Sequence, residues 1–222
     1  MKKYLFMAVA IIAALSSCSS DNDAIISDTG NTAPSTTGTA KAKIHGYYVD
    51  VNWVQLWENG PKFAEYNVGA TSVTEYGGHY SWGGHSDMKS DDYYENNHDL
   101  RHGWDTANKC WGSAWRQPTQ AEFQALLDNC DVVWTDNYKE SGVGGRIFTG
   151  KGDYASNSVF LPVAGYYENG TPRQGGYYWS STYSEEGTYY SCAFCMFFRS
   201  SFQGTSVFYR HFCCSVRAVL AE

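Results

Sequence analysis

Four cysteines crowd the end of the chain, and they are the side chains best suited to chemistry. Cys192 and Cys195 are separated by two residues, and Cys213 and Cys214 are adjacent. Clustered thiolates can bind zinc or act as a reactive pair. On a β-strand, however, residues one or three positions apart point to opposite faces, so these thiolates would converge only around a turn. We therefore expect no metal site and no cofactor here, and we interpret the cysteines as residues of a variable segment or as incidental disulfides.

A second set of possible metal ligands lies in residues 72–102, a segment rich in Gly, His, Asp, Asn and Tyr. The side chains concerned are His79, His85, His98, His102, Asp87, Asp91, Asp92, Glu95 and Asp99. Acidic loops can hold Ca²⁺, but the spacing matches neither an EF-hand nor a zinc motif. We expect long solvated loops in this segment.

Residues 194–214 carry aromatic, Arg, His and Cys side chains where a surface hairpin normally shows Asn, Ser, Thr and Lys. Aromatic residues and Arg dominate binding hot spots, and clustered exposed apolar surface marks interfaces. We predict that the ligand-binding residues are Phe194, Cys195, Phe197, Arg199, Phe208, Tyr209, Arg210, His211, Phe212 and Cys213. The alternative is that Phe194, Phe208 and Phe212 point into the core, because neighbouring strand residues face opposite ways.

Composition and motifs exclude several functions. The net charge is −7 and there is no run of Lys and Arg, so nucleic acid is not an expected partner. The chain has no phosphate-binding loop, no Gly-x-Ser-x-Gly elbow and no His-Glu-x-x-His motif. The 18 tyrosines, 22 glycines and 17% aromatic content favour strands and tight turns. We expect a binding protein and not an enzyme.

One helix can be predicted from local sequence. Thr119 and Glu122 form a capping box, and Phe123, Leu126 and Leu127 then make an apolar face that ends near residues 129–130. Short strands are predicted at residues 158–162, 177–181, 189–198, 205–212 and 214–220, with 189–198 and 205–212 paired across 200–204. The tryptophans expected in the core are Trp53, Trp57, Trp111, Trp115, Trp134 and Trp179.

The N-terminus predicts export. A short basic start and an apolar run to Leu15 precede Ser16, Ser17 and Cys18, which resembles the lipobox of bacterial lipoproteins. We predict a signal peptide at residues 1–17 and lipidation at Cys18; the alternative is an ordinary signal peptide with an incidental cysteine. Residues 19–23 resemble the acidic export signal of Bacteroidetes surface lipoproteins. The expected location is the outer membrane, lipid-anchored and facing the cell exterior.

Domain organisation follows from where large apolar residues begin. Residues 18–43 hold almost none beyond Ile25 and Ile26, so we predict a flexible stalk there and one domain over residues 44–222. Cys110 and Cys130 flank the predicted helix, and an oxidising compartment favours a disulfide between them. Such a bond would contribute roughly 3 kcal/mol; the alternative is two buried thiols.

The blocks from Cys110 to Val219 resemble a known family. Trp115-Arg116-Gln117-Pro118-Thr119 with Glu122-Phe123, followed by residues 145–150, 158–165, 177–182 and 215–219, resembles the Fibrobacter succinogenes major paralogous domain. The insertion between Trp111 and Trp115 is slightly longer than usual. The resemblance implies a C-type-lectin-like fold, similar to that of formylglycine-generating enzymes: an α+β domain with short twisted antiparallel strands, one or two helices and long loops.

The C-terminus resembles the variable region of proteins diversified by retroelements, at about residues 183–214. Such systems mutate adenines, so the changed codons encode Phe, Tyr, Ser, Cys, His, Arg and a few others but not Trp, Lys, Glu, Gln or Met. Residues 208–214 contain only permitted types, whereas Met196, Gln203 and residues 215–219 look like fixed framework, and Phe198 is expected to stay constant with them. Cys192 and Cys195 are the only candidates for an oxidase copper pair, and the motif around them does not match.

These observations predict a surface lipoprotein that binds an external protein or glycan through a diversified C-terminal face. It would be monomeric and would touch the membrane through its lipid anchor only. A structural or adhesive lipoprotein without diversification is the alternative, and a formylglycine-generating-type oxidase is a weaker one.

Overall fold

The computed structural model describes residues 35–95, 97–185 and 192–221. They belong to a compact unit that begins at Ser35. The predicted signal peptide, Cys18 and the first part of the stalk lie outside the described residues. No helix in the described ranges is long and apolar enough to cross a membrane.

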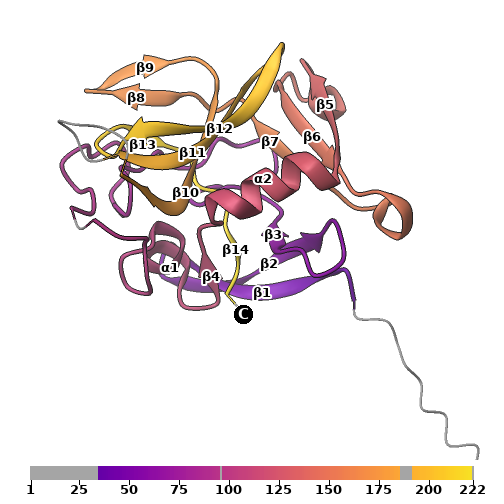
Figure 1. Ribbon diagram of the computed structural model, residues 1–222. Helices are drawn as coiled ribbons and strands as arrows, with labels where there is room; N and C mark the ends of the chain where they lie inside the picture. The colour runs from indigo at the N-terminus through magenta and orange to yellow at the C-terminus, as the bar shows by residue number, and fades with distance from the viewer. Residues whose placement is uncertain (1–34, 96, 186–191, 222) are drawn as a thin grey trace, which may run out of the picture. The chain divides into compact units, whose positions relative to one another are not determined.

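The first sheet joins both ends of the unit. Its order is β1-β2-β3-β14-β4, so the C-terminal strand lies between two internal ones (Figure 1). The strands are β1 (Thr37–Ile44), β2 (Tyr47–Gln55), β3 (Lys62–Ala64), β4 (Trp115–Arg116) and β14 (Val219–Leu220).

Strand β1 corrects the predicted domain boundary. Residues 37–43 were expected in the flexible stalk, but they pair with β2 along the whole strand. The prediction failed because small residues suffice here: Ala42 is fully buried and Gly38 lies against the Trp53 ring, which a side chain at that position would strike. The partner strand and Trp115, whose Nε1–H donates to the Lys41 carbonyl, supply the bulk that β1 lacks.

Three further antiparallel sheets complete the unit, each with three strands. One has the order β10-β11-β12: β10 (Gly176–Ser184), β11 (Cys192–Arg199) and β12 (Phe202–Tyr209). Another has the order β13-β8-β9: β8 (Tyr166–Glu168), β9 (Thr171–Arg173) and β13 (Cys213–Cys214). The last has the order β5-β6-β7: β5 (Asp131–Thr135), β6 (Gly145–Thr149) and β7 (Ser158–Pro162).

The helical content is small. The described residues hold two α-helices, α1 (Thr106–Trp111) and α2 (Gln120–Asn129), and two short 3-10 turns, η1 (Tyr138–Glu140) and η2 (Gly152–Tyr154). The described part of residues 72–102 contains neither helix nor strand apart from a single bridge at Tyr80, as the sequence predicted. The α+β prediction is therefore right at this level: the chain is mainly antiparallel strands with two helices.

Helix α2 begins as its capping box predicts. Thr119 Oγ1 accepts from the Glu122 N–H at 3.1 Å, and Glu122 Oε2 accepts from the Thr119 N–H at 2.7 Å. Arg116 holds the same carboxylate with two bonds of 2.7 and 2.8 Å. The pKa of Glu122 is lowered although burial alone would raise it, because these bonds favour the charged carboxylate.

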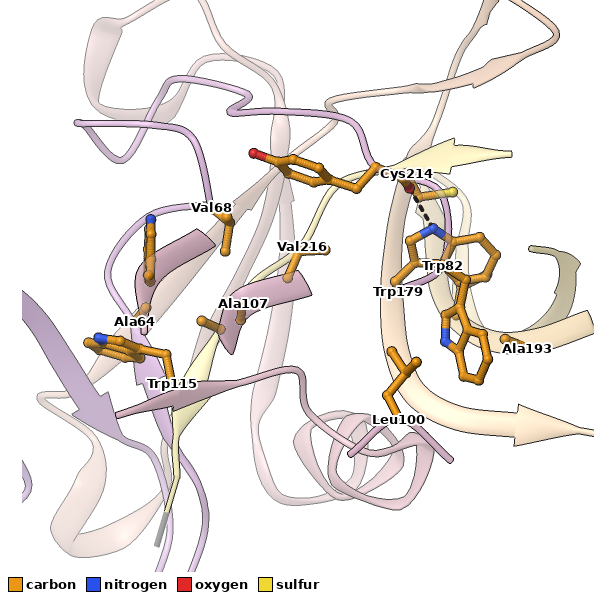
Figure 2. Close-up of a cluster of buried hydrophobic side chains, with 14 of the residues drawn as sticks. Ala64, Val68, Trp82, Leu100, Ala107, Trp115, Trp179, Ala193, Cys214 and Val216 are labelled. Atoms are coloured by element: carbon orange, nitrogen blue, oxygen red, sulfur yellow. Dashed lines mark hydrogen bonds between the residues drawn. The ribbon is translucent and has the colours of Figure 1, made fainter. Parts of the chain in front are cut away.

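Two hydrophobic clusters form the core, and β11 contributes to both. The first contains Trp82, Trp115 and Trp179, and the Trp179 Nε1–H donates to the Tyr80 carbonyl at 2.8 Å (Figure 2). The second contains Phe123 and Leu126 of α2. Of the tryptophans predicted as core, Trp111, Trp115 and Trp179 are buried, whereas Trp53, Trp57 and Trp134 are half-buried. Because alternate residues of β11 point to opposite faces, Ala193 and Cys195 belong to the first cluster, whereas Met196 and Phe198 belong to the second.

Leu126→Ala is expected to lower the free energy of unfolding by about 2–5 kcal/mol, because the fully buried side chain leaves a cavity beside Phe123. Denaturant unfolding measures the change. Gln124→Ala, on the exposed face of the same helix, is the matched control and should stay within about 0.5 kcal/mol. A loss below about 1 kcal/mol for Leu126→Ala would show that this helix face does not pack as described.

Candidate ligand-binding face

The predicted C-terminal hairpin is present and more deeply embedded than expected. Strands β11 and β12 pair from Cys192↔Tyr209 to Arg199↔Phe202, so the turn is shorter than the predicted 200–204. The predicted closing strand 214–220 is instead two short strands, β13 and β14, separated by an extended segment. Strand β11 is central in its sheet, and side chains from both of its faces pack into the two hydrophobic clusters.

One side of this sheet carries rings that touch one another, which we call the aromatic face: Tyr166, Tyr177, Phe197, Phe202 and Phe208. Ring centroids are 4.8 Å apart for Tyr166 and Phe208, 5.0 Å for Tyr177 and Phe208, and 5.3 Å for Phe197 and Phe202. Phe202 is 42% exposed and the others are half-buried. Tyr166, Tyr177 and Phe208 pack against the first cluster on one side, so the face presents only part of its ring surface to solvent while these contacts hold the side chains in place.

The aromatic face continues at the far end of β12. The His211 ring lies 5.7 Å from that of Tyr209 and 4.7 Å from that of Phe212, which contacts Phe208 at 4.9 Å. Tyr209 is 42% exposed, and His211 is half-buried. Burial lowers the pKa of His211, which favours a neutral imidazole at pH 7.

Four of the residues predicted to bind ligand are buried, which corrects the assumption that all were exposed: Cys195, Arg210, Phe212 and Cys213. Cys195 lies on the side of β11 that faces the first cluster, and Cys213 and Phe212 are covered in the segment around β13. Burial raises the pKa of Cys213 to about 11 and that of Cys195 further, so these thiols stay protonated at neutral pH. Protonated thiols are poor metal ligands and poor nucleophiles.

Arg210 fixes the fold rather than presenting a charge to solvent. Its guanidinium lies 4.7 Å from the Trp82 ring centroid and 4.6 Å from that of Tyr183. It donates to the Cys192 carbonyl at 3.1 Å and to the Tyr94 carbonyl at 3.0 Å. One side chain thus joins the long loop, β10 and the start of β11.

The predicted disulfide between Cys110 and Cys130 is wrong for this structure, because both thiols are free. The two residues pack in different places: Cys110 against the first cluster, and Cys130 within the second. Burial raises the pKa of Cys110 to about 11 and that of Cys130 to about 12. The alternative prediction, two covered thiols that are not bonded to each other, describes Cys110 and Cys130 better.

A pocket of about 580 Å³ opens beside the turn between β11 and β12, and we call it the arginine pocket. Its lining residues are Tyr76, Trp134, Val163, Ala164, Gly165, Arg173, Gln174, Gly175, Arg199 and Ser200. Arg199 is the only predicted ligand-binding residue among them. Sequence reasoning missed Arg173 and Tyr76, and it placed Trp134 in the core. The available signal was a single Arg among the Asn, Pro and Gly residues of 169–176, a composition typical of an exposed turn.

A separate groove of about 480 Å³ lies between β1, β2 and β7, and no predicted site residue lines it. Its Glu65 carboxylate already accepts from the Asn52 side chain at 2.8 Å. Among the described residues, no group of three or more His, Cys, Asp or Glu side chains is arranged to hold a metal ion. The predicted ligand-binding residues therefore gather at two surfaces, the aromatic face and the arginine pocket.

Comparisons with protein-family models, with curated proteins and with solved structures found no match to this chain.

Proposed function

We propose that the protein is a lipid-anchored surface protein that binds an external protein or glycan through the aromatic face. In this proposal the fold is C-type-lectin-like, the chain is related to the Fibrobacter succinogenes major paralogous domain, and Cys18 carries the acyl chains. The protein would act by binding, without catalysis. The observation that carries the proposal is the continuous set of half-exposed rings on a well-packed sheet.

Exposing apolar ring surface of this kind to water is unfavourable, and binding a ligand removes that exposure. Contiguous exposed apolar patches on soluble proteins usually mark interfaces. Aromatic side chains give large contact area and lose little entropy on binding. Among the predicted ligand-binding residues, we retain those that are exposed or half-buried for contact with the ligand: Phe197, Arg199, Phe208, Tyr209 and His211. Phe194 is also half-buried, but alternation places it on the side of β11 that carries Met196 and Phe198.

The burial pattern also supports diversification. Met196 and Phe198, expected as framework, are fully buried in the second cluster, while Phe197 between them is half-buried. Substitution at a buried site costs stability, but a change at a site such as Tyr209 usually stays within about 0.5 kcal/mol. A mutator acting on this segment could therefore change the binding face without unfolding the domain.

Deep sequencing of the 3′ end of the gene within one lineage tests this proposal. Substitutions should concentrate at Phe197, Tyr209 and His211 and should be rare at Met196 and Phe198. Cys195 and Arg210 have permitted codons but are buried, so surviving variants should rarely change them. Substitutions spread evenly over framework and face would contradict targeted diversification.

A further inference from the structure

The arginine pocket is positively charged in a chain whose net charge is −7. Arg173 comes from β9 and Arg199 from the end of β11, and both line the pocket. No Asp or Glu is among its lining residues. Glu168 pairs with Arg173, so Arg199 supplies the excess positive charge, and a concave site with such an excess concentrates anionic ligands.

Both arginines keep donors available for a ligand. Arg173 contacts Glu168 through Nε at 2.8 Å and Nη2 at 2.7 Å. A guanidinium has five N–H donors and the ion pair with Glu168 uses two of them, so the others remain available and donate to no described residue. The Arg199 side chain donates to no described residue and lies 5.9 Å from the Phe202 ring centroid.

Arg146 of β6 holds the pocket wall in place. Its Nη2 donates to the carbonyls of Arg199 at 2.8 Å and Ser200 at 3.1 Å, which fixes the turn that carries Arg199. The same guanidinium lies 5.7 Å from the Trp134 ring centroid. In Figure 1 the yellow hairpin of β11 and β12 accordingly extends toward β5 and β6. One buried cation thus positions an arginine and an aromatic residue of the pocket.

The remaining lining suits a ring-shaped ligand. Trp134 is half-buried, and its Nε1–H is already used by Asp136 at 2.7 Å, so what it offers a ligand is apolar ring surface. Tyr76 contributes a second, 43% exposed ring. Gly165 and Gly175 have positive φ, and the Gly165 N–H donates to the Gly175 carbonyl at 2.7 Å, so part of the lining is bare backbone.

We propose that the arginine pocket binds the carboxylate of an acidic sugar, with Arg173 and Arg199 on the carboxylate and Trp134 or Tyr76 against the sugar ring. Guanidinium groups match carboxylates with paired, charge-assisted hydrogen bonds. A volume of about 580 Å³ suits a sugar unit better than a single side-chain carboxylate. This inference rests on the proposed external-ligand function and names the ligand class for one end of the hairpin.

The test is calorimetric titration of the purified full chain in detergent with matched pairs of sugars. Sialyllactose is compared with lactose, and methyl glucuronide with methyl glucoside. We expect the acidic member of at least one pair to bind about tenfold or more tightly than its neutral partner, and its affinity to fall as salt is added. Equal affinities within both pairs, or binding of an acidic hexapeptide with no binding of the acidic sugars, would overturn the proposal.

Variants locate the site. Arg173→Gln and Arg199→Gln should each raise the Kd for the acidic sugar about tenfold. Arg101→Gln removes an exposed arginine outside the arginine pocket and should leave the Kd for the acidic sugar unchanged. Glu168→Gln should keep or strengthen binding, because it releases Arg173; a purely structural role for that ion pair predicts weaker binding, which would count against the proposal.

Tyr209 separates this proposal from the broader one. Tyr209 pairs with Cys192 of β11. Cys192 is seven residues from Arg199 along that strand, which corresponds to about 23 Å. Tyr209→Ala should leave the sugar Kd unchanged, and a loss equal to that of Arg173→Gln would place the sugar outside the pocket. If no acidic sugar binds but sequencing still shows targeted substitutions at Tyr209, only the pocket proposal fails. Even substitution along the segment would contradict the binding-face proposal whatever the titration shows.

Discussion

Arg217→Ala is expected to destabilise the protein by about 3–5 kcal/mol, because each buried acceptor left without its donor costs about 1–3 kcal/mol. Arg217 is 0% exposed. Its guanidinium donates to Asn67 Oδ1 at 2.9 Å, to the carbonyls of Ala64 and Glu65 at 2.9 and 2.7 Å, and to the Phe160 carbonyl at 2.9 Å. Alanine would leave these acceptors without a donor in a site too enclosed for easy hydration.

The charge of Arg217 persists despite its burial. Desolvation lowers its pKa to about 10, so the side chain is still a cation at pH 7. The carbonyl oxygens around it replace the water that a cation would otherwise bind. Arg217→Lys should therefore also destabilise the protein, because a single ammonium cannot reach acceptors on β3, on β7 and in the loop after β3 at once.

Denaturant unfolding checks this prediction. Arg101→Ala is the matched control, since it removes the same charge from an exposed position and should change stability by less than about 0.5 kcal/mol. A change below about 1 kcal/mol for Arg217→Ala would show that the guanidinium does not join these segments. The result also bears on the proposed diversification, because Arg217 belongs to the framework that should not vary.

Local signals in the sequence predicted the parts of the fold that depend on near neighbours. Helix α2 follows from Thr119 and Glu122, which contact each other three residues apart. The pairing of β11 with β12 follows from two strand-like runs separated by a short turn. Strand β1 was missed for the complementary reason: its residues are small, and the bulk that covers them comes from Trp53 on the paired strand and from Trp115, much later in the chain.

The candidate site depended on contacts that no local pattern reveals. Alternation showed that some hairpin residues would face inward, but not which side the long loop of residues 72–102 would cover. That loop brings Trp82 and Tyr94 onto Arg210, and the Trp82 N–H donates to the Arg210 carbonyl at 2.8 Å. The arginine pocket likewise joins Trp134, Arg173 and Arg199, which are far apart in sequence.

Arg210→Ala is the second substitution with a large expected effect, and it distinguishes a structural arginine from a ligand-binding one. The side chain is 0% exposed, lies between the rings of Trp82 and Tyr183, and donates to two backbone carbonyls. Its loss removes a cation from between two aromatic faces and opens a cavity beside the first cluster. We expect a loss of about 3–5 kcal/mol in unfolding free energy, from the cavity and from the two buried carbonyls left without a donor.

The matched control for Arg210→Ala is Arg199→Ala on the same hairpin. Arg199 is exposed and its guanidinium donates to no described residue, so the change should cost less than about 0.5 kcal/mol. Both variants remove one positive charge from residues that the sequence alone would assign to the same binding face. Thermal and denaturant unfolding should separate them clearly. If Arg210→Ala unfolds like the unsubstituted chain, then Arg210 is not enclosed as described, and it returns to the set of candidate ligand contacts.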